Sequence, residues 1–277
     1  MYSFIILHYK NIEDTINLLT SIKSVLKDND YNIIVVDNNT LTKPEEKLIS
    51  KFTNDILKLN DNVGFAKANN KAIKFAEDKY NSKYYIVINN DIIITQEDFL
   101  SRINEDYEKY DFDMLGPNIS SPSNESVNPF PVFSTKEEVE YQIKKANKLI
   151  KIYNNAFLYN LLKIYLNTKH IFKKPIKPQN GNKVEKGVAL HGCAIIFSDK
   201  YINKYKYPFY NETFLFHEEE FLYQRVIKDK LISVYDPNLK IFHKEGSSVK
   251  KNKNERESKL FREKERIKSL ELLLKEM

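Results

Sequence analysis

Three acidic residues stand in a row in the second half of the sequence, Glu218, Glu219 and Glu220. A carboxylate that is held against a hydroxyl group can take its proton during a displacement, and such a general base is common in group-transfer enzymes. Acids at the start of a helix also have a plainer explanation, because they match the positive end of the helix dipole. The run alone is therefore compatible with a catalytic role and with a structural one.

Polar side chains also follow four apolar runs in the first half of the sequence. The runs and the polar residues after them are Phe4 to Leu7 with His8 and Tyr9, Ile33 to Val36 with Asp37, Ile56 to Leu59 with Asn60 to Asn62, and Tyr84 to Ile88 with Asn89 to Asp91. Open parallel sheets bind ligands beyond the carboxyl ends of their strands, so four such ends indicate a ligand cleft. Asn and Asp also end strands without any ligand, which explains a single end equally well.

A scaffold of alternating strands and helices must position these residues. Ile33 to Val36 is apolar on both faces, which is typical of a parallel strand that is covered on both sides. A helical period of 3.6 residues follows over 12–26 and again from Phe65 to Ala76. The alternation predicts an α/β fold with a Rossmann-like, mostly parallel central sheet flanked by helices.

The rest of the sequence predicts further strands together with several helices. The predicted elements are a strand over 112–115, a loop over 117–133, one long or two consecutive amphipathic helices from Val139 to Ile164, a turn at 191–192 leading into a strand to Phe197, a helix from Glu218, two short strands over 232–235 and 239–242 around a turn, and a charged helix from Glu257.

Positive charge is concentrated in the middle of the chain. The net charge is +6, and Ser134 to Lys177 holds ten Lys and three Glu, so the remaining residues sum to −1. Lys interleaved with Leu, Ile, Tyr and Phe suits an anionic membrane surface, and it also suits a solvated helical face of the protein. The segment contains no recognisable nucleic-acid motif, so a nucleic-acid partner is not expected.

Length and composition narrow the class of protein. A chain of 277 residues can bury a substantial core in one large or two small domains. A single cysteine, Cys193, excludes an intramolecular disulfide framework and favours a reducing, cytoplasmic compartment. The apolar runs are far shorter than the roughly 18 residues of a membrane helix, and the N-terminus lacks the basic start of a signal peptide.

An ordered set of motifs resembles glycosyltransferase family 2, the inverting enzymes of GT-A fold, and within it the rhamnosyltransferase-like bacterial branch. The matching segments are IILHYKN at the first strand, VVDNNT at the second, NVGFAKANNKA at a helix entry, INNDI in place of the family's D-x-D element, and then HGCAIIF, FLFHEEEFLYQR and IFHKEGSS. They span nearly the whole chain in the family's order. The resemblance implies a GT-A fold with a helical insertion and a C-terminal helix.

The resemblance also implies which residues bind a nucleoside diphosphate sugar. Asp37 would accept a hydrogen bond from the imide of uracil or thymine, and Tyr9 would pack on the base or ribose. Asn69 stands where many relatives carry an arginine near the diphosphate, and it has a helix-entry cap as its alternative role. Asn89, Asn90 and Asp91 would lie against the donor, and Asn70 is expected to buttress the strand ends.

The same resemblance implies a divalent metal and a general base. Asp91 and His243 would hold Mn²⁺ or Mg²⁺, and an imidazole ligand favours Mn²⁺. Asn89 replaces the first acid of the D-x-D element. Glu219 is the expected base for an in-line attack with inversion, and Glu218 is its competitor.

Supporting roles and the organisation of the chain follow from the family pattern. Arg225 is expected to pair with the acidic run or to touch phosphate, and His191 to support the site. The ranges are a nucleotide-sugar-binding half (1–116), a basic helical insertion (117–187), an acceptor and catalytic half (188–245) and a helical tail (246–277), all within one GT-A domain.

The expected function is transfer of a hexose or deoxyhexose from a UDP- or dTDP-sugar to a bacterial cell-surface glycan such as a capsule or O-antigen. The acceptor would be lipid-linked, the protein cytoplasmic or peripheral on the inner face of the membrane, and a homodimer would be one form of assembly. A nucleotidyltransferase is the alternative enzyme, although LHYKN offers no glycine-rich phosphate loop. A non-enzymatic membrane-binding module would leave the strand-end polar residues and the acidic run unexplained.

Overall fold

A computed structural model of the chain describes residues 1–27, 30–122, 127–169, 183–244 and 255–277. Its strands are β1 (Tyr2–His8), β2 (Tyr31–Asp37), β3 (Asp55–Lys58), β4 (Tyr84–Asn89), β5 (Ile92–Ile93), β6 (Met114–Ser120), β7 (Glu185–Lys186), β8 (Ala194–Ser198) and β9 (Ser233–His243). Its helices are α1 (Ile12–Leu26), α2 (Lys43–Ile49), α3 (Phe65–Tyr80), α4 (Phe99–Tyr110), α5 (Lys136–Asn154), α6 (Ala156–Lys169), α7 (Asp199–Lys204), α8 (Glu218–Lys228) and α9 (Glu255–Glu276).

The strands form one sheet in the order β3-β2-β1-β4-β8-β6-β9-β5, with β7 paired to β9. Strands β3, β2, β1 and β4 are all parallel, as the apolar runs predict. Strand β8 is antiparallel to both β4 and β6, and β6 is parallel to β9. The predicted α/β sheet, parallel from β1 to β4 and flanked by helices, is confirmed.

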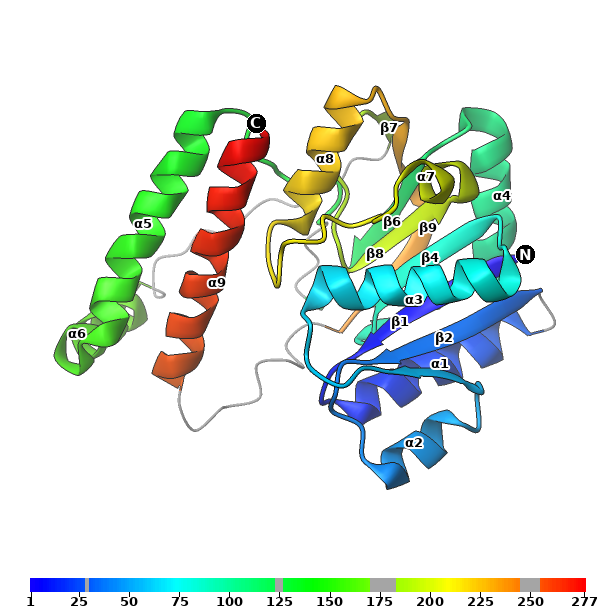
Figure 1. Cartoon of the computed structure of the whole chain (residues 1–277), viewed down its shortest axis with the longest axis horizontal. Helices are drawn as coiled ribbons and strands as arrows, with labels where there is room; N and C mark the ends of the chain where they lie inside the picture. Colours follow the sequence, from blue (N-terminus) through cyan, green and yellow to red (C-terminus); the bar gives the residue numbers. More distant parts are fainter. Residues whose placement is uncertain (28–29, 123–126, 170–182, 245–254) are drawn as a thin grey trace.

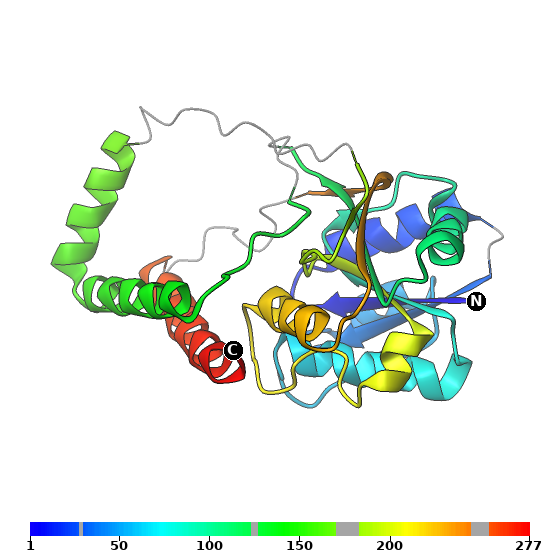
Figure 2. The same ribbon diagram turned by 90° about the horizontal axis from the view of Figure 1, so that it is seen from above.

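The sheet is covered on both faces because its strands are apolar on both faces. Alternate residues of β1 divide between two cores: Phe4 packs with α1 and α4, and Ile5 packs with α3, α7 and α8. Figure 2 shows α1 and α4 on one side of the strands and α3 and α7 on the other. The result is a three-layer arrangement in which the polar strand ends are free to form a site at one edge.

Two predictions for the second half of the sheet were wrong in detail. Strand β6 continues to Ser120 although a loop was expected from 117, and β9 is one strand where two were expected. The register between them slips at Pro117, because Asp236 pairs with Pro117 and Lys240 with Asn118. Proline lacks an N–H for the ladder, so the strand bulges at this point without ending. The expected boundary at 116 therefore falls inside β6.

Helices α2, α4 and α7 were not predicted from the sequence. Helix α4 was overlooked although its sequence carries a helical period. Phe99, Leu100 and Ile103 are buried, and Tyr107 and Tyr110 pack against the same core. Only the buried Asp106 interrupts this apolar face.

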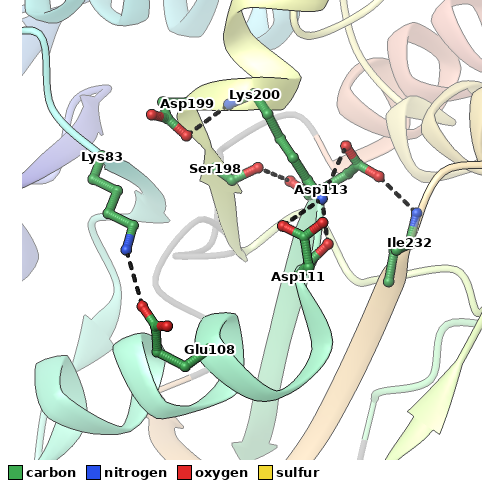
Figure 3. Close-up of polar contacts among 8 residues, drawn as sticks. All are labelled: Lys83, Glu108, Asp111, Asp113, Ser198, Asp199, Lys200 and Ile232. Carbon is green, nitrogen blue, oxygen red and sulfur yellow. Dashed lines mark hydrogen bonds and ion pairs between the residues drawn. The ribbon is translucent and has the colours of Figure 1, made fainter.

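A polar cluster joins the elements at the start of β4 and the end of β8, where Tyr84 pairs with Ser198. Figure 3 shows Asp113 at its centre: its carboxylate accepts from the Ile232 amide at 2.7 Å, and its carbonyl accepts from the Ser198 amide at 3.1 Å. Lys200 forms an ion pair with Asp111 at 3.0 Å. This cluster lies at the opposite end of β4 from Asn89, so it fixes the sheet and takes no part in the cleft.

Helices α5, α6 and α9 stand apart from the sheet, and α5 and α9 run side by side (Figures 1 and 2). The predicted amphipathic region is two consecutive helices. Its apolar stripe is not continuous: Val139, Ala146 and Tyr153 of α5 are buried, whereas Phe157 of α6 is 69% exposed. The end of the basic segment at 170–177 and residues 245–248 of the last motif lie outside the described residues.

Candidate functional site

The carboxyl ends of β1, β2 and β4 meet at one edge of the sheet. His8 is in register with Asp37, and Leu7 is in register with Asn89. His8 is fully buried, its Nδ1 lies 2.7 Å from the Thr15 hydroxyl, and burial lowers the pKa of its imidazole. Parallel pairing thus brings the predicted polar residues together, with a neutral imidazole beneath them.

Asp37 ends β2, and Tyr9 directly follows β1 at the same edge of the sheet. One carboxylate oxygen of Asp37 accepts from the amides of Thr40 at 2.8 Å and Leu41 at 3.1 Å, which fixes the turn after β2. Tyr9 is 41% exposed, and the Lys10 ammonium lies 4.8 Å from its ring centroid. The Tyr9 ring is therefore available for stacking, whereas Asp37 already has a structural task.

The turn into α3 is held by residues that sequence reasoning missed. Asn38 is buried, donates to Asn62 at 2.8 Å and accepts from the Val63 amide at 2.9 Å. Gly64 has φ +85°, and a Cβ atom on it would lie 2.2 Å from the Phe214 carbonyl oxygen. Only glycine permits this close approach, which brings the segment before α8 against the start of α3.

Asn69 and Asn70 are buried inside this joint. Asn69 lies one turn into α3 and donates to the Phe65 carbonyl at 3.0 Å, so it is not the helix-entry cap, which is Gly64. Asn70 accepts from the Phe209 amide at 2.8 Å and donates to its carbonyl at 3.0 Å. The expectation that Asn70 supports the strand ends was wrong. It holds residues 209–211 because it lies on the face of α3 that the segment before α8 covers.

Asn89 and Asn90 diverge at the end of β4. Asn89 borders the large cleft described below, and its amide donates to the Cys193 carbonyl at 2.8 Å. Asn90 turns back toward α1, where its side chain donates to the Thr15 hydroxyl at 3.0 Å and to the Asn11 carbonyl at 3.2 Å. Of the two, Asn89 is the one placed to meet a ligand in the cleft.

Asp91 and His243 come together because β5 pairs with β9, where Ile92 is in register with His243. The His243 Nε2 lies 3.2 Å from an Asp91 carboxylate oxygen. Among the described residues no group of three or more His, Cys, Asp or Glu side chains is arranged to hold an ion. One carboxylate and one imidazole nevertheless fit a divalent cation that takes its other oxygens from a diphosphate and water.

His191 lies beside this pair. Its Nδ1 accepts from the Cys193 amide at 3.1 Å, and its ring contacts Phe130 edge to face. Burial and, to a smaller extent, the neighbouring His243 lower the pKa of His191 to about 4 against the opposing effect of Asp91. His191 is therefore neutral near pH 7, and its supporting role stays a prediction.

Lys244 is a cation of the site that sequence reasoning missed. Its ammonium lies 2.8 Å from the buried Asp14 carboxylate, and its amide donates to the Asp91 carbonyl at 3.0 Å. It directly follows His243, the last residue of β9. The signal was present in the motif IFHKEGSS, but only the pairing of β9 with β5 shows that the lysine reaches α1.

The acidic run begins helix α8, and its three carboxylates have different surroundings. Glu218 and Glu220 are buried at 6% and 4% exposure, whereas Glu219 is half-buried. The Glu219 carboxylate accepts from the Gly192 amide at 3.0 Å, and a Cβ atom at Gly192 would lie 2.9 Å from it. Glu220 lies 3.0 Å from His217 Nδ1.

Burial dominates the electrostatics of this run. Desolvation and the neighbouring Glu219 raise the pKa of Glu218 to about 8, and desolvation also raises the pKa of Glu219. A helix N-terminus by itself would lower these pKa values. An exposed position at the positive end of the helix dipole therefore does not explain these acids. A carboxylate with a raised pKa is a stronger base, as proton abstraction requires.

A cleft of about 710 Å³ lies between Asn89 at the end of β4, His191 and the acidic run. Its lining also includes the segment 130–133 and residues of α3 and α8, among them Phe65, Phe130, Glu218 and Glu219. Two residues of the outer helices also border it, Gln142 of α5 and Arg266 of α9. The expected insertion and tail therefore form one wall of the cleft.

Arg225 was predicted to pair with the acidic run or to touch phosphate, and the structure contradicts the pairing. Its guanidinium donates to the Pro208 carbonyl at 2.6 Å and the Tyr207 carbonyl at 3.0 Å, and it stacks over the Tyr205 ring. Six residues separate Arg225 from Glu219, about 9 Å along the helix. The side chain reaches the 205–208 segment on the far side of α8 instead of the cleft.

Comparisons with known proteins identify the family and the fold of the chain. The model of glycosyl transferase family 2 matches residues 3–173. The structure of S. aureus TarS 1–349 is similar with a TM-score of 0.55 and 12% sequence identity, over 88% of this chain and 60% of that chain. TarS in complex with UDP-GlcNAc matches 49% of this chain and 37% of that chain, with 22% identity and a TM-score of 0.37.

The similarity to TarS 1–349 shows a shared fold. This chain spans 60% of the length of that TarS chain. A search of curated proteins found no match.

Proposed function

Because the chain belongs to glycosyl transferase family 2, whose model matches more than half of it, we propose that it transfers a hexose or deoxyhexose with inversion. The donor is a UDP- or dTDP-sugar, and the acceptor is a lipid-linked bacterial surface glycan of the capsule or O-antigen kind. The observation that carries the proposal is one cleft bordered by Asn89 at the end of β4, by His191 and by Glu219. A rhamnosyl donor is the first to test.

The donor side is supported by the strand ends. Tyr9 offers an exposed ring for the base or ribose, and Asp37 keeps one oxygen outside its turn to accept from an imide. Asn89 borders the cleft where a sugar diphosphate would extend from these two residues. Lys244 adds positive charge beside Asp91, where a diphosphate would gain most from it.

Asp91 and His243 are the residues that would hold Mn²⁺ or Mg²⁺. A divalent cation stabilises the negative charge that develops on a leaving diphosphate. His191 stays neutral beside them, so it adds no competing positive charge. Lys244 orients this part of the site by binding both Asp14 and the backbone of Asp91.

Glu219 is the proposed general base. It borders the cleft and is the most accessible of the three acids, and the Gly192 amide fixes one of its oxygens. The acceptor hydroxyl would bind against its carboxylate, which takes the proton as the oxygen attacks the anomeric carbon. Glu218 lies deeper, and its pKa of about 8 keeps it protonated near pH 7.

The acceptor side is supported by the outer helices. Gln142 and Arg266 border the cleft from α5 and α9, opposite the strand ends. A guanidinium and an amide suit hydroxyl groups and an anionic linkage in a glycan. Acceptor selection therefore belongs to residues that lie outside the central sheet.

A donor screen tests the proposal. The full chain is incubated with UDP- and dTDP-sugars, with Mn²⁺, with Mg²⁺ or with chelator, and release of nucleoside diphosphate is measured. We expect release from a subset of donors, stimulated by metal. Thermal shift with UDP and dTDP supplies a binding readout, since a ligand at 100 times its Kd stabilises by about 2.7 kcal/mol. No release and no nucleotide-dependent shift would contradict the proposal.

The metal assignment has its own variant. Asp91→Asn should lower turnover at least about 100-fold, because it removes the carboxylate that would hold the cation, and it should abolish the stimulation by Mn²⁺. The matched control is Asp78→Asn, which removes an exposed acid of α3. Wild-type activity and an unchanged metal response of Asp91→Asn would contradict the assignment.

A further inference from the structure

Helix α6 presents an apolar face that the described residues leave uncovered. Five large side chains on it are between 42% and 69% exposed: Phe157, Leu158, Leu161, Ile164 and Tyr165. At 3.6 residues per turn, these five positions fall within an arc of roughly 120°. Single exposed apolar side chains are ordinary, but a contiguous set of this size marks an interaction surface.

The opposite face of α6 is already in use, so the orientation of the helix is fixed. Tyr159 is buried and its ring lies 5.8 Å from that of Tyr153 on α5. Lys163 forms an ion pair with Glu255 of α9 at 3.3 Å, and Lys259 lies over the Tyr159 ring. The exposed apolar face therefore points away from α5 and α9. Figure 2 shows α6 at the outer edge of the molecule, far from the sheet.

Charge identifies the partner. From Tyr141 to Val184 the sequence has ten lysines and no aspartate or glutamate. Lys145, Lys148 and Lys151 are exposed on α5, the helix that leads into α6. A second copy of the chain seated on this surface would bring lysines against lysines, and like charges facing each other oppose association. An anionic lipid surface attracts the same lysines and accepts the apolar side chains.

We propose that α6 lies in the interface of an anionic membrane with Phe157, Leu161 and Ile164 inserted among the lipids. The helix has 14 residues, about 21 Å, and is too short to span a bilayer. Among the residues that the structure describes, no helix has the length and apolar character to cross a membrane. The binding is therefore peripheral, and only α6 inserts, because the apolar stripe of α5 is buried against α9.

This surface binds lipid whichever sugar the enzyme transfers, so its test does not use catalysis. The full chain is floated with vesicles of phosphatidylcholine alone and of phosphatidylcholine mixed with phosphatidylglycerol, at low and high salt. We expect flotation with the anionic vesicles at low salt and a marked loss at high salt. Absence of flotation under every condition would overturn the proposal.

Two sets of substitutions separate the apolar and the electrostatic contributions. Phe157→Gln, Leu161→Gln and Ile164→Gln together should weaken binding about 1,000-fold, because each inserted side chain contributes about tenfold. Lys144→Gln, Lys145→Gln, Lys148→Gln and Lys151→Gln together should weaken binding to anionic vesicles by about 600-fold, at roughly fivefold for each lysine near the surface.

The matched control makes the same kind of substitution at exposed apolar residues outside α6. Leu48→Gln and Ile227→Gln replace apolar residues of α2 and α8 that are 42% and 58% exposed, and flotation should be unchanged. Circular dichroism and thermal melting confirm that each variant is folded. If the α6 triple variant floats like wild type but loses a dimer seen by light scattering, α6 is a subunit interface and the membrane proposal is wrong.

Discussion

Glu219 differs from its two acidic neighbours in what surrounds its carboxylate. All three acids border the cleft, but Glu218 and Glu220 are buried, whereas Glu219 is more accessible and is fixed by the Gly192 amide. Glu219→Gln keeps the size and the hydrogen-bond acceptor but removes the base. It should lower transfer by roughly 10²- to 10⁴-fold and leave nucleotide affinity unchanged.

The measurement is steady-state transfer together with nucleotide binding by calorimetry. Glu212→Gln, an exposed acid in the segment before α8, is the control and should behave as wild type. Glu218→Gln should keep most of its activity because that carboxyl is already protonated near pH 7. The opposite pattern, an inactive Glu218→Gln beside an active Glu219→Gln, would move the base to Glu218.

At the residue scale, strand ends and helix starts could be located from local pattern, but not every side-chain partner could be assigned. Asp91 follows β4, His243 ends β9 and Glu219 lies in the first turn of α8, and the roles of these three residues stay predictions. Arg225 and Asn70 were misassigned because their partners come from 205–211, a segment without local pattern that only tertiary packing brings to α3 and α8.

At the element scale, the entry into α3 depends on one glycine. Gly64 combines φ +85° with ψ −173°, a region open only to glycine, and a Cβ atom on it would lie 2.2 Å from the Phe214 carbonyl oxygen. Gly64→Ala must distort the α3–α8 joint. We expect it to destabilise the protein by about 3 kcal/mol in denaturant unfolding.

Gly187 supplies the comparison because it also has positive φ, at +67°, but a Cβ atom there would meet nothing within 4 Å. Gly187→Ala should cost only the backbone strain, about 1 kcal/mol. Equal effects of the two substitutions would show that the approach of Phe214 does not restrict residue 64.

A second element-scale prediction concerns the packing of α4 on β9. Asp106 is buried, and desolvation and the nearby Asp236 carboxylate raise its pKa to about 7. A carboxyl with a raised pKa in the folded state contributes stability below its unfolded pKa and loses it as pH rises through the folded value. The free energy of unfolding should therefore fall between about pH 4 and pH 7 through this group.

Asp106→Asn removes this titration. The variant should be more stable than wild type by about 2 kcal/mol near pH 8, and the difference should shrink toward pH 4. Urea unfolding across this range measures it. Asp98→Asn, an exposed acid at the start of α4, is the control. A constant difference between Asp106→Asn and wild type at all pH values would exclude the predicted titration.

Some strands could be predicted from the local sequence, and others could not. Strands β1, β2 and β4 were predictable because buried parallel strands are continuous apolar runs. Strand β9 was read as two pieces because Asp236, Pro237 and Asn238 form a turn-like sequence. The neighbouring β6 keeps the pairing on both sides of the bulge, and that long-range support has no local signature.

At the scale of the whole molecule, the outer helices are tied to the catalytic helix by a small separate core. Val139 of α5, Phe221 of α8 and Leu270 and Leu273 of α9 form it. Arg266, one turn before Leu270, borders the cleft. Leu270→Ala should loosen this wall and raise the KM for acceptor about tenfold, with the donor KM nearly unchanged.

Leu18→Ala is the matched control, because Leu18 is equally buried but packs between α1 and the sheet. Both substitutions should cost about 2–5 kcal/mol of stability. Only Leu270→Ala should change the acceptor KM in initial-rate measurements below the melting temperature. An equal acceptor effect from Leu18→Ala would mean that general destabilisation is responsible.

The pairing of β5 with β9 also determines when the site can form during synthesis of the chain. Asp91 and His243 are separated by about 150 residues, which a ribosome adds in roughly 8–30 s at 5–20 residues per second. Throughout that interval the nascent chain can already pair β1, β2, β3 and β4, but it has no imidazole beside Asp91. The helix that carries Arg266 emerges later still. The strands that carry Tyr9, Asp37 and Asp91 are thus made first, and the proposed site is complete only when β9 and α9 have emerged.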